Sequence, residues 1–133
     1  YPPLTAPKPT LPTKTAKSRQ RPDDMLLDAV IVWESLFGSN TDTSLRITSS
    51  LAWLLGSSPE DRLLKQAHYR KIYGARSRVV HAGKYLSLDE TRGFATESVE
   101  ISIDALRALF STHKHLLNSK DSAARSLDLM HGG

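Results

Sequence analysis

The chain has no cysteine among its 133 residues. This absence excludes disulfide bonds, thiolate metal sites and a thiol nucleophile. The sequence also lacks an apolar run long enough to cross a bilayer, a glycine-rich phosphate loop, an internal repeat and the alternating pattern of strands. It has 39% hydrophobic and 24% charged residues, which is the composition of an ordinary soluble globular protein. We therefore expect a single helical domain in the cytoplasm.

Residues 1–22 differ in composition from the rest of the chain. They hold six of the seven prolines, interspersed with Thr and Lys, and very few bulky apolar residues. Such a segment cannot bury enough surface to offset the entropy of ordering. We predict a flexible linker over 1–22 and a folded domain over 23–133. The chain begins with Tyr1 rather than Met, so we also expect it to be part of a longer protein.

The apolar spacing after residue 22 predicts an all-α fold. A first helix should end at Gly38, a second at Gly56, and a third should start at a Ser58 cap. The fourth carries apolar residues three, four and seven apart, which indicates a helix. We predict a four-helix up-and-down bundle with a disordered N-terminal linker and a short C-terminal helix. The predicted helices cover residues 23–37, a second segment for which Thr41, Asp42 and Thr43 are candidate N-caps and which Gly56 ends, and residues 59–83, about 97–118 and 123–130.

Three apolar features carry specific packing expectations. The stripe on the fourth helix consists of Val99, Ile103, Leu106, Phe110 and Leu117. Leu63 and Leu64 occupy apolar positions of the third helix. Trp33 and Trp53 also have helical spacing with other apolar residues, and we expect them to pack in the core or at a dimer contact.

The segment from Arg76 to Gly83 is the most informative part of the chain. It places a fixed positive charge, the Ser77 hydroxyl and the His81 imidazole close together in sequence. Arginine can hold two phosphate oxygens at once, and histidine exchanges protons near neutral pH. On a straight helix Arg76 and His81 are about 140° apart. They can meet only if the helix kinks near Gly74, if the long Arg side chain reaches round, or if a second copy completes the site.

This motif resembles the HEPN superfamily, and most closely its Apea-like branch. The resemblance covers about residues 25–117 and depends on the order Tyr73, Arg76-Ser77, His81-Ala82-Gly83 after a helix that ends Leu54-Leu55-Gly56. Glu34 and Arg46 also fall where such proteins tend to carry a glutamate and an arginine. The resemblance implies a helical homodimer with a metal-independent endoribonuclease site across the dimer axis, in the effector module of a defence or toxin-like protein.

The implied roles are specific to individual residues. The catalytic set is Arg76, Ser77 and His81, and RNA cleavage would proceed by attack of the 2′-hydroxyl on the adjacent phosphate. Residues implied to contact the RNA are Arg78, Tyr73, Glu34 and Arg46. No metal or other cofactor is expected. His113 and His115, near the end of the last long helix, are not expected to bind a metal either.

Other interpretations of the same residues stay open. Glu34 could form a structural salt bridge with Arg46 or Arg78 instead of contributing to the site. The domain could also be a non-catalytic HEPN-like module for dimerisation or RNA binding within a larger protein. In a third interpretation the chain is a purely structural bundle, in which Arg76 caps carbonyl groups and His81 ends a helix.

Overall fold

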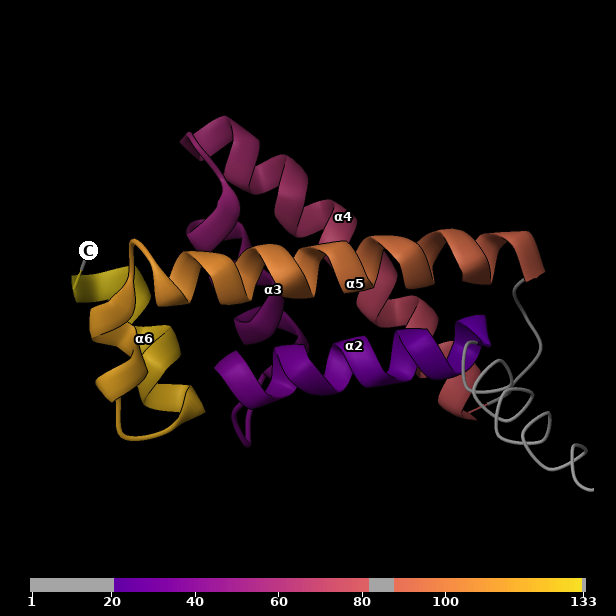
Figure 1. The fold of residues 1–133 in the computed structure, drawn as a ribbon, viewed down its shortest axis with the longest axis horizontal. Coiled ribbons are helices and arrows are strands. Elements are labelled where there is room, and N and C mark those ends of the chain that lie inside the picture. Colours follow the sequence, from indigo (N-terminus) through magenta and orange to yellow (C-terminus); the bar gives the residue numbers. More distant parts are fainter. Residues whose placement is uncertain (1–20, 82–87, 133) are drawn as a thin grey trace, which may run out of the picture.

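The structure of the chain is a computed structural model that describes residues 21–81 and 88–132. These residues form helices and connecting turns, without a strand, so the predicted all-α fold is confirmed. The predicted linker over 1–22 lies almost entirely outside the described residues. The helices are α2 (Pro22–Phe37), α3 (Thr43–Leu55), α4 (Pro59–His81), α5 (Leu88–Phe110), the short 3-10 helix η1 (Lys114–Asn118) and α6 (Ser122–Gly132) (Figure 1).

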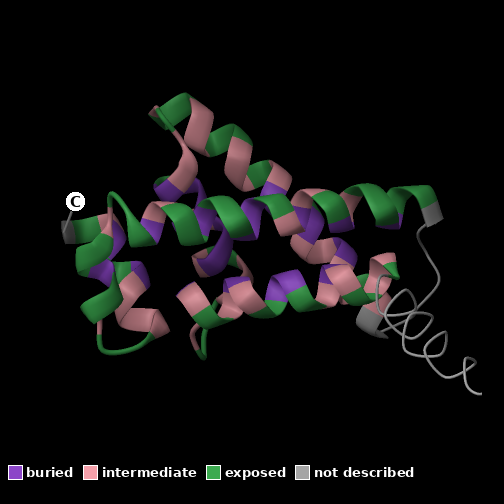
Figure 2. Cartoon of the chain, viewed as in Figure 1, coloured by how far each residue is buried: buried purple, intermediate pink, exposed green. Residues whose placement is uncertain are grey.

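The helices pack around α3. Helices α2 and α5 lie side by side along much of their lengths and run in the same direction, while α4 crosses behind α5 (Figure 1). Helix α3 contacts α2, α4, α5 and α6, which agrees with the apolar composition of its sequence. Helix α6 packs against α2 and α3. The long helices therefore leave α2 and α5 with one face on the core and another toward solvent (Figure 2).

The core is centred on Trp33, which has no exposed surface. Its indole N–H donates to the hydroxyl of Ser102 on α5 over 3.0 Å. That hydroxyl also contacts the carbonyl oxygens of Ser98 at 2.9 Å and Ala29 at 3.4 Å. Because serine is small, α5 can approach α2 closely at this point. The other fully buried large side chains are Leu26, Val30, Phe37, Ile47, Leu51, Ile72, Leu109 and Leu116.

Helix α5 differs most from its predicted form. It begins at Leu88 rather than near residue 97, and it ends at Phe110 rather than 118. Asp89 and Glu90 in its first turn favour a helix start there, because carboxylates stabilise the positive end of the helix dipole. After Phe110 the chain continues as a turn and then η1. The length of the helix was therefore predicted well, but its position was wrong by about two turns.

Much of the apolar stripe of α5 is exposed. Ile103 is 42% exposed, Leu106 37% and Phe110 60%. The buried residues of α5 are instead Thr91, Ala95, Ser98, Ile101, Ser102, Ala105 and Leu109. Leu63 and Leu64 at the start of α4 are 70% and 72% exposed, so these apolar positions of the helix do not face the core. Helix α5 packs on the core mainly through small residues, and much of its stripe of large apolar residues is exposed to solvent.

The predicted caps have mixed outcomes. At the start of α4 the Ser58 hydroxyl accepts the backbone N–H of Asp61 at 3.1 Å, and the Asp61 carboxylate accepts the N–H of Ser57 at 2.9 Å. The hydrogen bond from Ser57 is the main cause of the lowered pKa of Asp61. At the start of α3, by contrast, Asp42 has a left-handed φ of 49° and its side chain forms no cap. The Ser58 cap is therefore confirmed, whereas the first turn of α3 is not capped by a side chain of the preceding residue.

Two glycines should respond in opposite ways to alanine. At Gly56 a Cβ would lie 2.5 Å from Arg62 Cγ and 2.6 Å from the Ala52 carbonyl oxygen, whereas at Gly93 no atom outside the adjoining helix backbone would lie within 4 Å of it. We expect Gly56→Ala to lower the free energy of unfolding by about 1–3 kcal/mol through overpacking. Gly93→Ala, inside α5, should raise it by about 0.5–1 kcal/mol. Urea denaturation followed by circular dichroism measures both, and shifts of the same sign would contradict the local packing.

Candidate functional site

Three side chains from α2 and α4 form the candidate site, which we call the Glu34 cluster: Glu34, Tyr73 and Arg76. The Tyr73 hydroxyl donates to Glu34 Oε2 over 2.8 Å. The same carboxylate oxygen lies 3.9 Å from Arg76 Nη2. The side chains of Arg76 and Glu34 are 27% and 31% exposed, so the cluster is accessible from solvent. Tyr73 and Arg76 are three residues apart and therefore share one face of α4, opposite Glu34.

The protonation states in this cluster suit a hydrogen-bonding role. Burial, followed by the hydrogen bond to Glu34 and the charge of Glu34, raises the pKa of Tyr73 to about 12, although Arg76 opposes this shift. The phenol therefore remains a neutral donor at neutral pH. Arg76 Nε is buried and has no hydrogen-bond partner among the described residues. The buried Nε–H cannot reach an external anion, so a contact with an anion would come from the terminal N–H groups of Arg76.

The other residues predicted for the site do not join the cluster. Ser77 follows Arg76 on α4 and is half-buried. Arg78 is exposed, and its Nη1 lies close to Gly74 on its own helix. Arg46 lines a shallow groove between α3 and α6. Neither Arg46 nor Arg78 forms an ion pair with Glu34, so both salt bridges considered from the sequence were wrong, and Arg76 is the arginine beside Glu34.

His81 is the last residue of α4, and its side chain lies outside the described part of the structure, as do Ala82 and Gly83. Helix α4 continues as α-helix through Gly74 from Pro59 to His81. Positions 76 and 81 therefore keep the separation of about 140° around the helix axis that a regular α-helix imposes. A regular helix would leave the long reach of the arginine or a second copy of the chain to bring Arg76 and His81 together.

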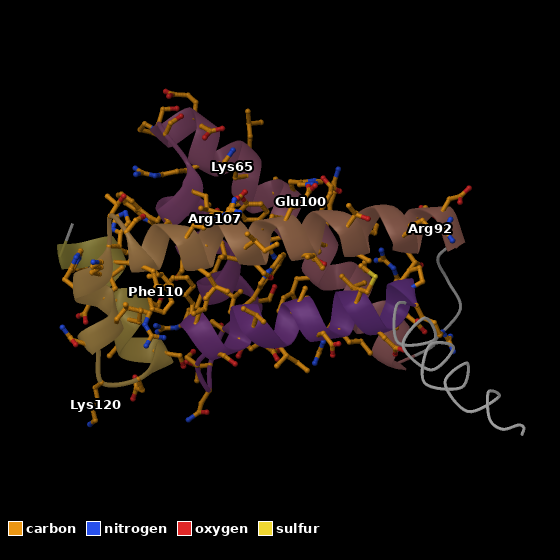
Figure 3. All side chains as sticks on the ribbon, viewed as in Figure 1. Lys65, Arg92, Glu100, Arg107, Phe110 and Lys120 are labelled. Carbon is orange, nitrogen blue, oxygen red and sulfur yellow. The ribbon has the colours of Figure 1, made fainter. Side chains whose placement is uncertain are left out.

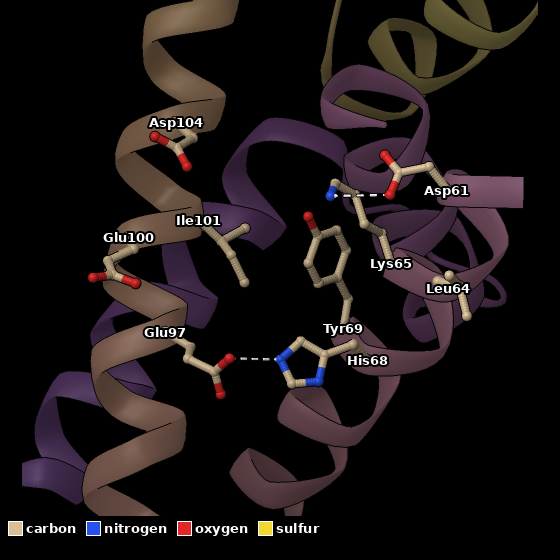
Figure 4. A pocket seen from close by; sticks show the side chains of 9 residues that line it. All are labelled: Asp61, Leu64, Lys65, His68, Tyr69, Glu97, Glu100, Ile101 and Asp104. Carbon is tan, nitrogen blue, oxygen red and sulfur yellow. Dashed lines mark hydrogen bonds and ion pairs between the residues drawn. The ribbon is translucent and has the colours of Figure 1, made fainter. Parts of the chain in front are cut away.

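A second polar cleft lies between α4 and α5, and Figure 4 shows its lining. His68 Nε2 lies 2.7 Å from Glu97 Oε2, and Lys65 Nζ lies 3.4 Å from Asp61 Oδ1. Glu100 and Asp104 add two further carboxylates from α5. Carboxylates outnumber positive groups here, so the cleft attracts cations and repels phosphate. This face of the molecule is therefore a poor candidate for RNA contact.

The sequence did contain a signal for this cleft. Glu97, Glu100 and Asp104 are spaced three and four residues apart, which places them on one face of a helix. The apolar stripe on the neighbouring face is the more conspicuous pattern, and the carboxylates alone do not predict a cleft. Tyr69 also lines the cleft, and burial is the main cause that raises its pKa to about 12.

Comparison with known proteins adds no relative. No protein-family model, curated protein or solved structure matches this chain. Within the described residues, no group of three or more His, Asp and Glu side chains could hold a metal ion, and this includes the region of His113 and His115. No helix in that same part of the chain is long and apolar enough to span a membrane. The functional interpretation therefore depends on the residues themselves.

Tyr73 should make the stability of the domain sensitive to alkaline pH. Its pKa in the folded chain, about 12, exceeds the ordinary value of 10.0. Above pH 10 the unfolded chain loses this proton more readily, so the free energy of unfolding should fall between about pH 10 and 12. Tyr69 should contribute in the same direction. Tyr73→Phe should therefore reduce the alkaline slope, as measured by urea denaturation at several pH values, and an unchanged slope would contradict the raised pKa of Tyr73.

Proposed function

We propose that this chain is a HEPN-like domain of the Apea-like branch and a metal-independent endoribonuclease. The observation that carries the proposal is the Glu34 cluster, because it combines three residues that the resemblance assigns to the site. Within it, a half-buried arginine retains N–H donors and lies beside a neutral phenol. The arginine lies five residues before His81, the last residue of the same helix. In this proposal Arg76 is the phosphate ligand and His81 is the proton carrier.

The proposed reaction needs only groups that the motif supplies. A base removes the proton of the RNA 2′-hydroxyl, and the oxygen attacks the adjacent phosphorus while the 5′-oxygen leaves with a proton. The products are a 2′,3′-cyclic phosphate and a free 5′-hydroxyl. His81 moves the protons, and Arg76 stabilises the negative charge that develops on the phosphate oxygens. Ser77 orients the imidazole or the phosphate, and Tyr73 donates a hydrogen bond close to Arg76.

Glu34 has a positioning role in this proposal. Its carboxylate accepts the hydrogen bond of Tyr73 and lies 3.9 Å from Arg76 Nη2, so in this proposal its charge orients the guanidinium. A held arginine loses less conformational entropy when it binds a phosphate. Arg78 and Arg46 are outside this cluster and would contact the RNA away from the scissile phosphate.

The active form in this proposal is a homodimer. Because positions 76 and 81 face different directions on a regular helix, the arginine of one copy and the histidine of the other would form each site. The parent protein would be a defence or toxin-like protein in the cytoplasm, with this domain as its effector module.

A second candidate function is a HEPN-like module that does not cut RNA and supplies dimerisation or RNA binding. The ion pair between Arg76 and Glu34 favours it, because part of the arginine's charge is already neutralised inside the chain. The two functions share one fold, so only activity separates them.

The test is incubation of the purified protein with a mixed RNA pool in the presence of a metal chelator. We expect cleavage that leaves cyclic phosphate and 5′-hydroxyl ends. An RNA with a single 2′-deoxy nucleotide at the main cleavage site should resist cutting there, because the nucleophile is missing. Products with 5′-phosphate ends, or activity that the chelator abolishes, would contradict the mechanism. Cleavage no greater than that of an Arg76→Ala protein would favour the non-catalytic module.

A further inference from the structure

The polar cleft between α4 and α5 contains a phenol without a hydrogen-bond partner. Tyr69 is 4% exposed and lines the cleft, and Figure 4 shows its ring and hydroxyl between the two helices. The hydroxyl forms no hydrogen bond within the described residues. Burial, and then the charges of Asp61 and Asp104, raise its pKa to about 12, so the phenol is neutral at pH 7. Because an unpartnered polar group is costly to bury, this hydroxyl indicates a hydrogen-bonding ligand in the cleft.

The charges left free in this cleft are negative. Its basic side chains, Lys65 and His68, each already contact a carboxylate. Glu100 and Asp104 are exposed on α5 and form no ion pair in residues 21–81 and 88–132; Figure 3 labels Glu100 on α5 and Lys65 on α4. Arg107, about one turn beyond Asp104, does not line the cleft. Two carboxylates are therefore available to a bound cation.

The spacing of these groups suits an extended organic cation better than a metal ion. No three of the His, Asp and Glu side chains that the structure describes could together hold a metal. Glu100 and Asp104 are four residues apart, which separates them by about 6 Å along α5. Ile101 lines the cleft between them and is 9% exposed. A short chain of methylene groups can cover this apolar surface while an ammonium group at each end reaches a carboxylate.

We propose that the cleft between α4 and α5 binds a linear alkylammonium ligand, a free diamine or polyamine. One ammonium group donates to the Tyr69 hydroxyl oxygen and to Asp104, and the next donates to Glu100. The methylene groups between them lie on Ile101. The cleft has a volume of about 320 Å³, which is within the range of small-molecule sites. The proposal does not depend on RNA cleavage, because none of these residues belongs to the Glu34 cluster.

The first experiment titrates the protein with spermidine in a calorimeter, at an ionic strength of about 0.15 M. We expect the wild type to bind one spermidine per chain. Glu100→Gln and Asp104→Asn should each raise the dissociation constant about five- to tenfold, because each removes a charged hydrogen-bond acceptor. Asp28→Asn is the matched control, since it removes the same charge from an exposed position on α2 outside the cleft. It should leave the affinity nearly unchanged.

The second experiment uses Tyr69→Phe to separate a binding role of the hydroxyl from a structural one. The hydroxyl has no partner in the free chain, so its removal should leave the melting temperature of the free protein unchanged or slightly higher. The same change should raise the dissociation constant for spermidine about fivefold, because one hydrogen bond to the ligand is lost. The rise in melting temperature that spermidine causes should shrink accordingly.

Several outcomes would overturn the proposal. A wild-type protein that does not bind spermidine overturns it, and so does equal weakening by Asp28→Asn and Asp104→Asn, which indicates diffuse attraction of cations. Displacement of spermidine by an equal concentration of Mg²⁺ overturns the preference for an organic cation. A tetralysine peptide that binds more tightly than spermidine assigns the cleft to a basic segment of another protein instead. Unchanged affinity in Tyr69→Phe overturns the contact with the phenol.

Discussion

Replacing Trp33 by alanine should lower the free energy of unfolding by about 3–5 kcal/mol, the usual range for a large aromatic side chain in a core. The side chain has no exposed surface and packs against Tyr69, with ring centroids 6.1 Å apart. Alanine would leave a cavity between α2, α4 and α5. Domains of this size have a total stability of about 5–15 kcal/mol, so the loss would be a large fraction of it. Urea denaturation followed by circular dichroism measures the change.

Two milder substitutions keep this prediction testable even if Trp33→Ala does not fold. Trp33→Phe retains most of the volume and removes the hydrogen bond to Ser102, so we expect a loss of about 1–2 kcal/mol. Trp53→Ala is the matched control, because Trp53 is 39% exposed and stacks against the Arg62 guanidinium at 3.9 Å. Its cost should be about 1 kcal/mol. Equal effects at positions 33 and 53 would contradict the central place of Trp33 in the core.

The second large effect is expected on RNA cleavage. His81→Ala should lower the rate about 10²–10⁴-fold, which is the range for loss of a general acid or base. Arg76→Ala should lower it about 10²–10³-fold, because it removes the charge that stabilises the phosphate oxygens. Arg76→Lys keeps the charge but loses the forked geometry, so it should recover only part of the activity. The readout is the initial rate of cleavage in chelator.

The matched control for these variants is Arg70→Ala. Arg70 is exposed on the same helix, and its replacement removes one positive charge outside the Glu34 cluster. It should retain activity within a small factor, which separates a specific role of Arg76 from general attraction of RNA. Equal losses for Arg70→Ala and Arg76→Ala would contradict the proposed role. Each variant is compared only after its thermal melt shows that it is folded.

The sequence predicted helices α2, α3, α4 and α6 well, because their ends coincide with strong signals. Gly38 and Gly56 follow α2 and α3 directly, and Ser58 caps α4. Helix α5 was harder to locate because its buried face is built from small residues such as Ala95, Ser98 and Ser102. Hydrophobic periodicity marks the largest apolar residues, and on α5 those residues form a groove at the surface instead. An apolar stripe that packs in the core and one that stays at the surface have the same spacing in a sequence.

The candidate site shows the same contrast between local and long-range information. Tyr73 and Arg76 could be placed together because their spacing puts them on one helical face. Their partner Glu34 lies 39 residues before Tyr73 in the sequence, so this contact depends on how α4 crosses α2. The arginine that would pair with Glu34 could not be selected among Arg46, Arg76 and Arg78 from spacing alone. The His68–Glu97 cleft was missed because it needs the relative positions of α4 and α5.

The most direct test of the proposed site is to mix the Arg76→Ala and His81→Ala proteins, each nearly inactive, and refold them together. If Arg76 of one copy and His81 of the other form each site, random pairing gives mixed dimers in half of the population, each with one intact site. The mixture should then recover about a quarter of wild-type cleavage. A mixture no more active than its two components would contradict a shared site built from Arg76 and His81.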